Sequence, residues 1–525
     1  MEKIILIILD GWGIAPPGPA NPISQVNLLE INKIENNFPA TTLTASGISI
    51  GLPWWEEGNS EVGHLTIGSG RITYHYLIKI LNAVRDGSFF KNEVLLEAIN
   101  NVKNKNSKMH LVGLVGPAGV HSYLEHLEAL FKICKDNGLS QERIFLHAFT
   151  DGRDSGPMEG KKVLQNLLEK MKENQWGQIS TITGRTFTLD RENRWNRIKK
   201  GYNLLTSGDG EKIKNPIEYL EDSYKKEIYD EQIPPAVVVD EQGSAIGLIK
   251  ENDSVIFFDF REDSERELTR AFIEEDFKEF EREKIPNLFF VGMTKYIDKP
   301  NFKFAFEKDR VENSFGELIS NLGYKQLRLA EIEKFAHVTS FFNALKQKPF
   351  EGEDRIVIPP SAWGKHYEIK PEMGAFEIKD TLIEIAKKDI YQFILVNFAN
   401  PDIIGHSGNF KAAIKTCKII DSCIGELVKE LIFNHTIIIT ADHGNIEQMF
   451  DSITGRRTPG HTTNPVPFYL IKKEFQGKGK NKTPLNQRQN TGGSLADIAP
   501  TMCEIMQIPQ PKEMTGLSLL PDLIE

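Results

Sequence analysis

Apolar residues fall into short continuous runs along the chain. The first covers residues 4–9, is rich in β-branched side chains, and stops at an Asp and a Gly. A run without polar alternation indicates a strand that is covered on both faces, as in a parallel sheet. Further runs of this kind are residues 255–258, 288–291, 393–396 and 436–440.

Between these runs lie segments with helical periodicity. In residues 412–433, apolar side chains recur at steps of three and four, which is typical of a helix with one buried face. Predicted strands that alternate with predicted helices favour an α/β architecture built on parallel sheets.

The length and the net charge of the chain limit the number of domains and the class of partner that we expect. A chain of 525 residues exceeds what one core usually organises, which predicts two or more domains. With 63 Lys and Arg against 73 Asp and Glu, the formal charge is −10, and this argues against nucleic acid or an anionic membrane as a partner. The four cysteines form no CxxC pair, and no apolar run approaches the length of a membrane span. We expect a cytoplasmic protein.

Candidate metal-binding side chains occur at three predicted strand ends and in one further loop. Asp10 ends the first strand, Asp402 and His406 follow the strand at 393–396, and Asp442 and His443 follow the strand at 436–440. On a helical turn, residues four apart such as Asp402 and His406 face the same way and can bind one ion. The further loop contributes His461.

Each of these segments has an ordinary alternative explanation. An acid after a strand is often a turn or helix N-cap residue, and Asp402 with His406 can equally be a loop acid beside an unrelated histidine. Several Asp and His residues at strand ends, without cysteine, favour a divalent-metal centre that holds two ions such as Mn²⁺, Zn²⁺ or Co²⁺.

The segment at residues 58–64, GNSEVGH, is the sharpest local motif. A divalent cation that coordinates Ser60 would lower the pKa of its hydroxyl and make it a nucleophile toward phosphorus. The structural alternative is that Ser60 is a helix N-cap. The two interpretations are compatible, because a helix N-terminus also stabilises phosphate. His64 fits a hydrogen-bonding role better than a ligand role.

Taken together, these motifs resemble the cofactor-independent phosphoglycerate mutases of the alkaline-phosphatase superfamily. The resemblance rests on residues 9–13, 58–64, 151–154, 327–331, 441–445, 461–467 and 495–501, and so covers nearly the whole chain. It implies an α/β fold in which an alkaline-phosphatase-like parallel-sheet domain is interrupted by an inserted α/β phosphotransferase domain. We expect the first domain at 1–76 and 311–525 and the insert at 77–310, with the active site between them.

The resemblance also assigns roles to residues. One metal would be held by Asp402, His406 and His461, and the other by Asp10, Ser60, Asp442 and His443. The implied ions are two Mn²⁺, with Mg²⁺ or Co²⁺ as substitutes, and no 2,3-bisphosphoglycerate is required. Asp154 would help to transfer protons, and the implied state is a monomer whose partner is a small-molecule phosphoglycerate.

A set of basic residues is expected to bind that substrate. Guanidinium forks suit both its phosphate and its carboxylate, although any single arginine is more often a solvated surface charge. The family positions favour His121, Arg153, Asp154, Arg185, Arg191, Arg261 and Lys334. The sequence departs from the family pattern at Ser264, where a second arginine is usual.

The predicted reaction interconverts 3-phosphoglycerate and 2-phosphoglycerate through a phosphoserine at Ser60, in glycolysis and gluconeogenesis. A metal-dependent phosphatase or phosphodiesterase of the same superfamily is the alternative. It would share the metal segments but would not need Asp154, Arg191, Arg261 and Lys334 together. A non-catalytic anion-binding protein is a third possibility, which the intact ligand set disfavours.

Overall fold

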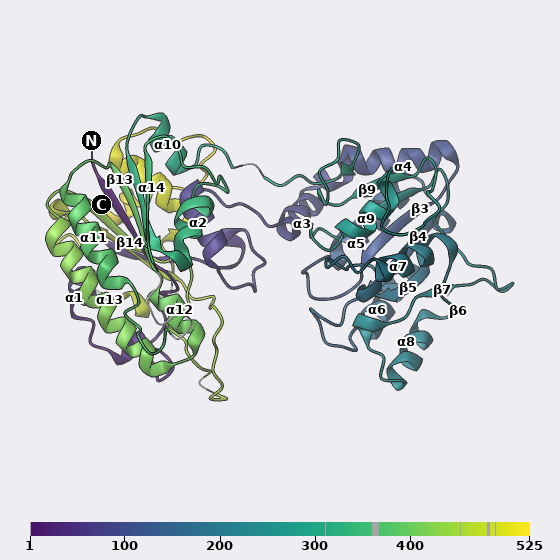
Figure 1. Cartoon of the computed structure of the whole chain (residues 1–525), viewed down its shortest axis with the longest axis horizontal. Helices are drawn as coiled ribbons and strands as arrows, with labels where there is room; N and C mark the ends of the chain where they lie inside the picture. The colour runs from purple at the N-terminus through teal and green to yellow at the C-terminus, as the bar shows by residue number, and fades with distance from the viewer. Residues whose placement is uncertain are drawn as a thin grey trace. The chain divides into compact units, whose positions relative to one another are not determined.

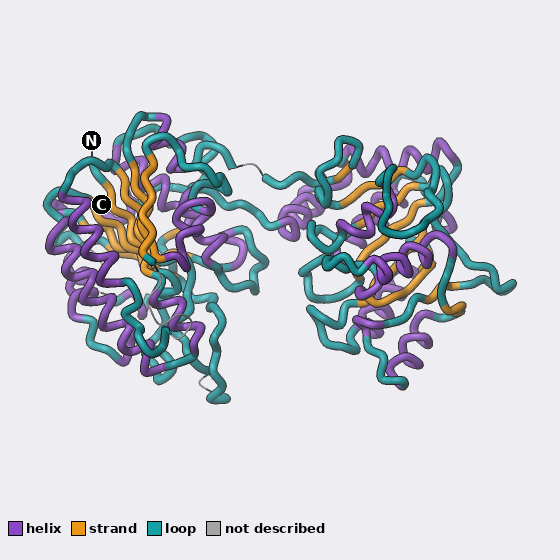
Figure 2. The backbone as a smooth tube through the Cα atoms, viewed as in Figure 1, coloured by secondary structure: helices purple, strands orange, loops and turns teal. Residues whose placement is uncertain are grey.

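The computed structural model describes residues 2–309, 311–359, 367–451, 453–479, 483–488 and 490–524. The chain folds into two compact units, Met1–His75 with Asp309–Glu525, and Tyr76–Lys308. Each unit is built around one sheet with helices on both sides (Figures 1 and 2). None of the helices in the described residues has the length and apolar character that crossing a bilayer requires.

The sheet of the first unit has the strand order β12-β11-β13-β1-β14-β15-β2-β16. All neighbouring pairs are parallel except those of β15, which runs antiparallel to β14 and β2. Its strands are β1 Ile4–Leu9, β2 Ala40–Thr44, β11 Gln326–Glu331, β12 Glu353–Ile358, β13 Phe393–Phe398, β14 Thr436–Thr440, β15 Val466–Ile471 and β16 Gly493–Ser494.

The central strands β13, β1 and β14 are buried along their whole length, because helices cover both faces of the sheet. Helix α13 packs against α1 and α11 on one side, and α2 contacts α10 and α14 (Figure 1). The helices are α1 Leu29–Asn37, α2 Ser60–Ser69, α10 Phe315–Asn321, α11 Ala375–Lys387, α12 Asn400–Ser407, α13 Phe410–Leu431, α14 Ile498–Met506 and α15 Leu520–Ile524.

The second unit repeats this plan with the strand order β10-β9-β8-β3-β4-β5-β7-β6. Only the β5–β7 pair is antiparallel. Its strands are β3 Met109–Leu114, β4 Ile144–Thr150, β5 Gln178–Gly184, β6 Glu211–Ile213, β7 Ala236–Val238, β8 Ser254–Phe257, β9 Phe289–Gly292 and β10 Lys303–Phe304. Its helices are α3 Tyr76–Asp86, α4 Glu93–Lys105, α5 Leu124–Asp136, α6 Gly160–Asn174, α7 Trp195–Ser207, α8 Pro216–Lys225 and α9 Arg266–Ile273.

The two parallel-dominated sheets confirm the predicted α/β class. Strands β1 and β14 have the bounds that the apolar runs predicted, and α13 lies within two residues of its predicted ends. One interpretation was wrong: Ser60 is the first residue of α2, and the N-cap is Asn59, whose side chain accepts the backbone N–H of Val62. All four cysteines are buried and free.

Strand β11 ends at a fully buried acid, Glu331. Burial raises the pKa of its carboxyl from 4.5 to about 8, opposed by a backbone N–H of Gly374 and reinforced by Glu333 and Glu377. Between these two values the folded chain keeps a proton that the unfolded chain has lost. Stability therefore falls as pH rises from 4.5 to 8, by about 1.4 kcal/mol per pH unit at most.

We expect Glu331→Gln to remove this penalty. The variant should gain little thermal stability over the native chain at pH 5, where both carry a neutral side chain, and several degrees at pH 8. Thermal unfolding midpoints at the two pH values measure the difference, with exposed Glu504→Gln as the control. A gain that does not grow with pH would contradict the argument.

Candidate metal centre

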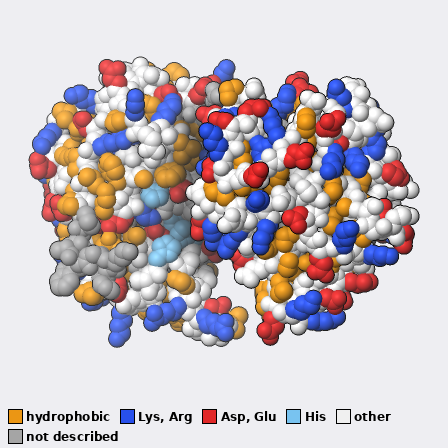
Figure 3. Space-filling view, turned by 45° about the vertical axis from the view of Figure 1, so that its right-hand side comes forward, with side chains coloured by type: hydrophobic (Ala, Val, Ile, Leu, Met, Phe, Trp, Pro, Cys, Tyr) orange, Lys and Arg blue, Asp and Glu red, His pale blue; other side chains and the backbone are white. Residues whose placement is uncertain are grey.

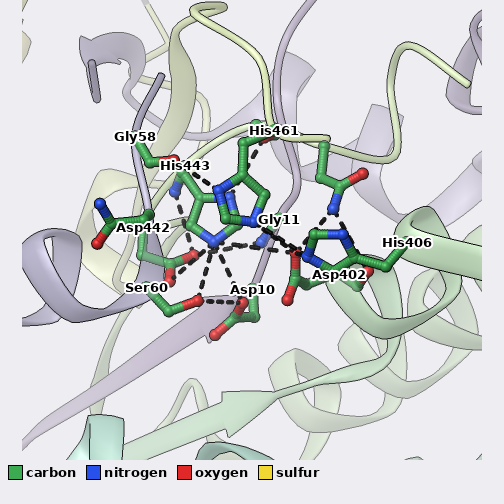
Figure 4. A network of polar contacts seen from close by, with 12 residues as sticks. Asp10, Gly11, Gly58, Ser60, Asp402, His406, Asp442, His443 and His461 are labelled. Atoms are coloured by element: carbon green, nitrogen blue, oxygen red, sulfur yellow. Dashed lines mark hydrogen bonds and ion pairs between the residues drawn. The ribbon is translucent and has the colours of Figure 1, made fainter. Parts of the chain in front are cut away.

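The predicted metal ligands of the first unit converge at one edge of its sheet. Asp10 follows β1, Asp402 and His406 lie on α12 directly after β13, and Asp442 and His443 follow β14. Because β13, β1 and β14 are adjacent and parallel, the residues that follow them meet at their carboxyl ends. Figure 4 shows these side chains pointing toward one another, together with Ser60 from α2 and His461 from the loop between β14 and β15.

Two groups of side chains have their ligand atoms close enough to hold an ion. One contains Asp402, His443 and His461, and the other contains Asp10, His64 and Asp442. His406 lies beside the first group, with Nε2 3.2 Å from Asp402 Oδ1 and 3.1 Å from His461 Nε2.

Three imidazoles present the same ring nitrogen to the carboxylates. His461 Nδ1 donates to the carbonyl of Gly58 at 2.7 Å, and His406 Nδ1 donates to that of Pro459 at 2.6 Å. His443 Nδ1 makes the corresponding bond, to its neighbour Gly444, at 3.2 Å. A carbonyl can only accept, so in the neutral ring each Nε2 carries a lone pair, and this tautomer is the one that a metal ligand needs.

Charge balance also fits bound cations. Asp10 and Asp442 are fully buried and Asp402 nearly so, and Asp442 Oδ2 lacks a hydrogen-bond partner among the described residues. Burial lowers the pKa of His443, and the carboxylates of Asp442, Asp10 and Asp402 reverse this and raise it to about 9. Buried carboxylates this close together need positive charge, and oxygen with imidazole ligands suits Mn²⁺ or a similar ion. The residues present therefore fit a divalent-metal centre.

Ser60 lies inside this group of charges. Its Oγ is 3.2 Å from Asp10 Oδ1, 2.9 Å from His443 Nε2 and 2.7 Å from Lys334 Nζ. Ser60 also opens helix α2, so the positive end of the helix dipole faces its hydroxyl. The surroundings can stabilise both an ionised serine oxygen and a phosphate attached to it.

Lys334 belongs to this centre in the structure. Its ammonium donates to Asp10 Oδ1 at 2.6 Å and to Asp402 Oδ2 at 2.7 Å, besides Ser60. Burial lowers its pKa, but these carboxylates more than reverse the effect and hold the pKa above its ordinary value. Lys334, which was expected to bind substrate, therefore contacts Ser60, the predicted nucleophile.

His64 is held by hydrogen bonds at both ring nitrogens. Nδ1 donates to the carbonyl of Ser60 at 2.8 Å, and Nε2 accepts from Asn397 Nδ2 at 3.1 Å. The same amide group donates to Asp10 Oδ2 at 2.7 Å, so Asn397 orients one candidate ligand. Asn445 does the same for Asp402 Oδ1, at 2.8 Å.

These two amides were not among the site residues predicted from the sequence. Asn397 had a usable signal, because it is a polar residue inside the otherwise apolar strand β13. The sequence marks Asn445 less clearly. It stands directly after Asp442, His443 and a glycine, and the acid and the histidine are sufficient to account for that motif. Histidine side chains reach the molecular surface in a patch (Figure 3), and His406 is 45% exposed, so the centre is open to small anions.

In the second unit, the predicted substrate residues follow four adjacent parallel strands, β8, β3, β4 and β5. His121, Asp154 and Arg185 form one group: Arg185 Nη2 lies 2.6 Å from His121 Nε2, and Arg185 Nη1 donates to Asp154 and to Asp151. Burial, then the charges of Arg185 and Arg261, lower the pKa of His121 to about 3. His121 is therefore neutral and accepts from Arg185.

Arg191 and Arg261 are joined through a third residue. Both guanidinium groups donate to the carboxylate of Asp263, at 2.8 Å from Arg191 and 2.6 Å from Arg261. Ser264 is buried and donates to the same carboxylate at 3.1 Å. Arg153 lies apart from them, paired with Glu231.

Glu265 is a further residue that the sequence analysis missed. It is fully buried and accepts from His121 Nδ1 at 3.0 Å, which leaves Nε2 of the neutral ring as an acceptor. Nothing local marks it in the sequence, because it is one acid among several charged residues at positions 261–267.

Comparisons with known proteins agree with one another. Residues 80–298 match the family model described as the N-terminus of BPG-independent PGAM. The chain is 44% identical to the 2,3-bisphosphoglycerate-independent phosphoglycerate mutases of Clostridium botulinum, over 521 residues, and of Clostridium tetani, over 522, with 99% of both chains covered in each case. A Leishmania mexicana phosphoglycerate mutase, whose crystal structure was determined at low cobalt concentration, aligns with a TM-score of 0.58 and 25% identity, covering 98% of this chain and 97% of that one.

If the centre binds divalent ions, Mn²⁺ added to chelator-treated protein should raise its thermal midpoint. Ion at 100 times its Kd contributes about 2.7 kcal/mol per site. Asp402→Asn should lose the contribution of the site to which Asp402 belongs, since Asp402 Oδ1 faces both His406 and His461. Asp389→Asn, which alters only a surface ion pair with Lys3, is the control. An equal gain in both variants would rule the centre out.

Proposed function

Because this chain belongs to the 2,3-bisphosphoglycerate-independent phosphoglycerate mutases, we propose that it interconverts 3-phosphoglycerate and 2-phosphoglycerate through a phosphoserine on Ser60. The observation that carries the proposal is the position of Ser60 Oγ, within hydrogen-bond distance of Asp10, His443 and Lys334. The family name implies that no 2,3-bisphosphoglycerate is required. We assign the reaction to glycolysis and gluconeogenesis.

The proposed metal ligands are those implied by the resemblance: Asp402, His406 and His461 for one ion, and Asp10, Ser60, Asp442 and His443 for the other. Two Mn²⁺, or Mg²⁺ or Co²⁺ in their place, would lower the pKa of the Ser60 hydroxyl and neutralise phosphate charge. The three backbone-anchored imidazoles support this assignment, because their Nε2 atoms are free of protons in the neutral rings.

In the first half-reaction, the ionised Ser60 Oγ attacks phosphorus, and the bond from phosphorus to O3 of the substrate breaks. Lys334 is placed to hold the serine oxygen and then the phosphate by charge and hydrogen bonding. The departing O3 takes a proton from Asp154. In the second half-reaction, the O2 hydroxyl returns a proton to Asp154 and takes the phosphoryl group, which regenerates Ser60.

The cluster in the second unit is proposed to hold glycerate between the two steps. Arg185, Arg191 and Arg261 offer charge and paired donors for the substrate carboxylate, while His121 and Arg153 contact its other oxygens. Retention matters because loss of glycerate at the phosphoserine stage would leave water as the acceptor and turn the reaction into hydrolysis. One chain supplies both clusters, which supports action as a monomer.

The first test is a coupled mutase assay with 3-phosphoglycerate and Mn²⁺, without 2,3-bisphosphoglycerate. The native chain should form 2-phosphoglycerate, and Ser60→Ala should lose at least about 10³-fold in rate. Ser69→Ala, a buried serine on the same helix, should keep its activity. Release of phosphate without 2-phosphoglycerate would favour the phosphatase alternative, and Mn²⁺ binding without turnover would favour an anion-binding protein.

The role of Asp154 gives a second test. Asp154→Asn can still accept from Arg185 but cannot carry a proton, so kcat should fall about 10²- to 10⁴-fold with little change in KM for 3-phosphoglycerate. Steady-state kinetics separates the two constants, and Asp136→Asn on the surface of α5 is the control. An unchanged kcat, or a loss confined to KM, would remove Asp154 from proton transfer.

A further inference from the structure

Glu447 is a buried acid that no step of the proposed reaction uses. It lies in the loop that follows β14, and its side chain is 1% exposed. The carboxylate accepts four hydrogen bonds. Oε2 accepts the backbone N–H of Gly13 at 3.1 Å and that of Asn445 at 2.8 Å. Oε1 accepts from Asn464 Nδ2 at 2.9 Å and from the hydroxyl of Thr462.

The four donors come from three short stretches, one after β1 and two within the loop between β14 and β15, and each stretch carries candidate metal ligands. Gly13 lies three residues after Asp10, and Asn445 lies two residues after His443. Thr462 directly follows His461, and Asn464 belongs to the same loop. One carboxylate group therefore connects the loops of both proposed metal sites.

The backbone leaves no space between the carboxylate and these loops. A Cβ atom on Gly13 would lie 2.2–2.5 Å from the carboxyl atoms of Glu447. On Gly444, it would lie 2.3 Å from Thr462 Oγ1 and 2.5 Å from Glu447 Oε1. A side chain at either position would displace the carboxylate or the Thr462 hydroxyl, so glycine at both positions allows the loops to approach the carboxylate closely.

The chemistry of the donors selects a carboxylate. Two backbone N–H groups, one amide NH₂ and one hydroxyl all face it, and an ionised carboxylate is a side chain that only accepts. An amide at this position would turn its own NH₂ toward two donors. Four charge-assisted bonds also compensate the loss of hydration of the buried charge.

We propose that Glu447 is a positioning residue of the metal centre, which sets the mutual spacing of the Asp10, His443 and His461 loops. Its four hydrogen bonds are made to residues beside the candidate ligands, and not to the ligands, the substrate or the reacting atoms. The inference rests on the metal site of the proposed function, but it does not require the mutase reaction. Groups behind metal ligands of this kind alter metal affinity about 10- to 100-fold when they are replaced.

Glu447→Gln tests the proposal on the full chain after chelator treatment. The signal of free Mn²⁺ in electron paramagnetic resonance measures binding during a titration, and the Kd of at least one ion should rise about 10- to 100-fold. The matched control is Glu353→Gln, at another buried carboxylate of the same unit, which accepts from Asn343 and Arg355 at the start of β12. Native affinity for both ions in Glu447→Gln, or an equal loss in the control, would overturn the proposal.

Activity measured against Mn²⁺ concentration distinguishes a positioning role of Glu447 from a general loss of structure. Glu447→Gln should need more Mn²⁺ for activity but recover most of its kcat at saturating Mn²⁺, with KM for 3-phosphoglycerate unchanged. A kcat that stays low when both ions are bound would contradict a role in positioning. A chain without mutase activity that still shows the affinity loss would overturn the proposed function and support this inference.

A milder variant covers the case in which Glu447→Gln does not fold. Thr462→Val keeps the shape of the side chain but removes one of the four donors, on the His461 loop. This variant should bind one of the two ions more weakly and bind the other with nearly native affinity. Thr501→Val, at a buried threonine of α14, controls for the loss of a hydroxyl. Native affinity for both ions in Thr462→Val would count against the proposal.

Discussion

Mutual repulsion of buried carboxylates is the constraint on which the first unit depends. Asp10, Asp402 and Asp442 follow three adjacent parallel strands, and the register of those strands brings them to one place in the interior. The three carboxyl groups are buried there, so their charges must be balanced by cations or by hydrogen-bond donors. Several groups supply this balance: Lys334, three imidazoles, the amides of Asn397 and Asn445, and the first turn of α2. The catalytic proposal follows from the same fact, because the Ser60 hydroxyl lies among these groups and contacts Lys334 and His443.

In the second unit the clustered groups are cationic, and internal carboxylates hold them in place. Arg185 is buried against Asp151, Asp154 and His121, while Arg191 and Arg261 share the carboxylate of Asp263. An internal carboxylate keeps such guanidinium groups in place without a ligand. If these arginines bind the substrate carboxylate, as proposed, that carboxylate would have to compete with Asp263 for the same donors, and the competition would lower affinity.

Much of this architecture was predictable, because strand identity and the order of acids and histidines are local properties. The apolar runs located β1 and β14 within the chain, and an acid directly after each pointed to the edge where the site lies. The grouping of Lys334 with Ser60 was not predictable, since 274 residues separate them and only the packing of β11 brings them together. Asn59 took the capping role considered for Ser60, because residue identity alone does not distinguish two adjacent candidates. Glu265 lacked any periodic or motif signal.

The backbone carbonyls that receive the Nδ1 protons of His406, His443 and His461 have a consequence for how this centre can change. In many metalloproteins, a neighbouring acid fixes the orientation of the imidazole, and a single substitution there retunes the ligand. Here the corresponding acceptors are main-chain oxygens of Pro459, Gly444 and Gly58, which no side-chain replacement removes. Drift in sequence around the histidines should therefore preserve ring orientation and basicity, and only an insertion or deletion in those loops would reset them.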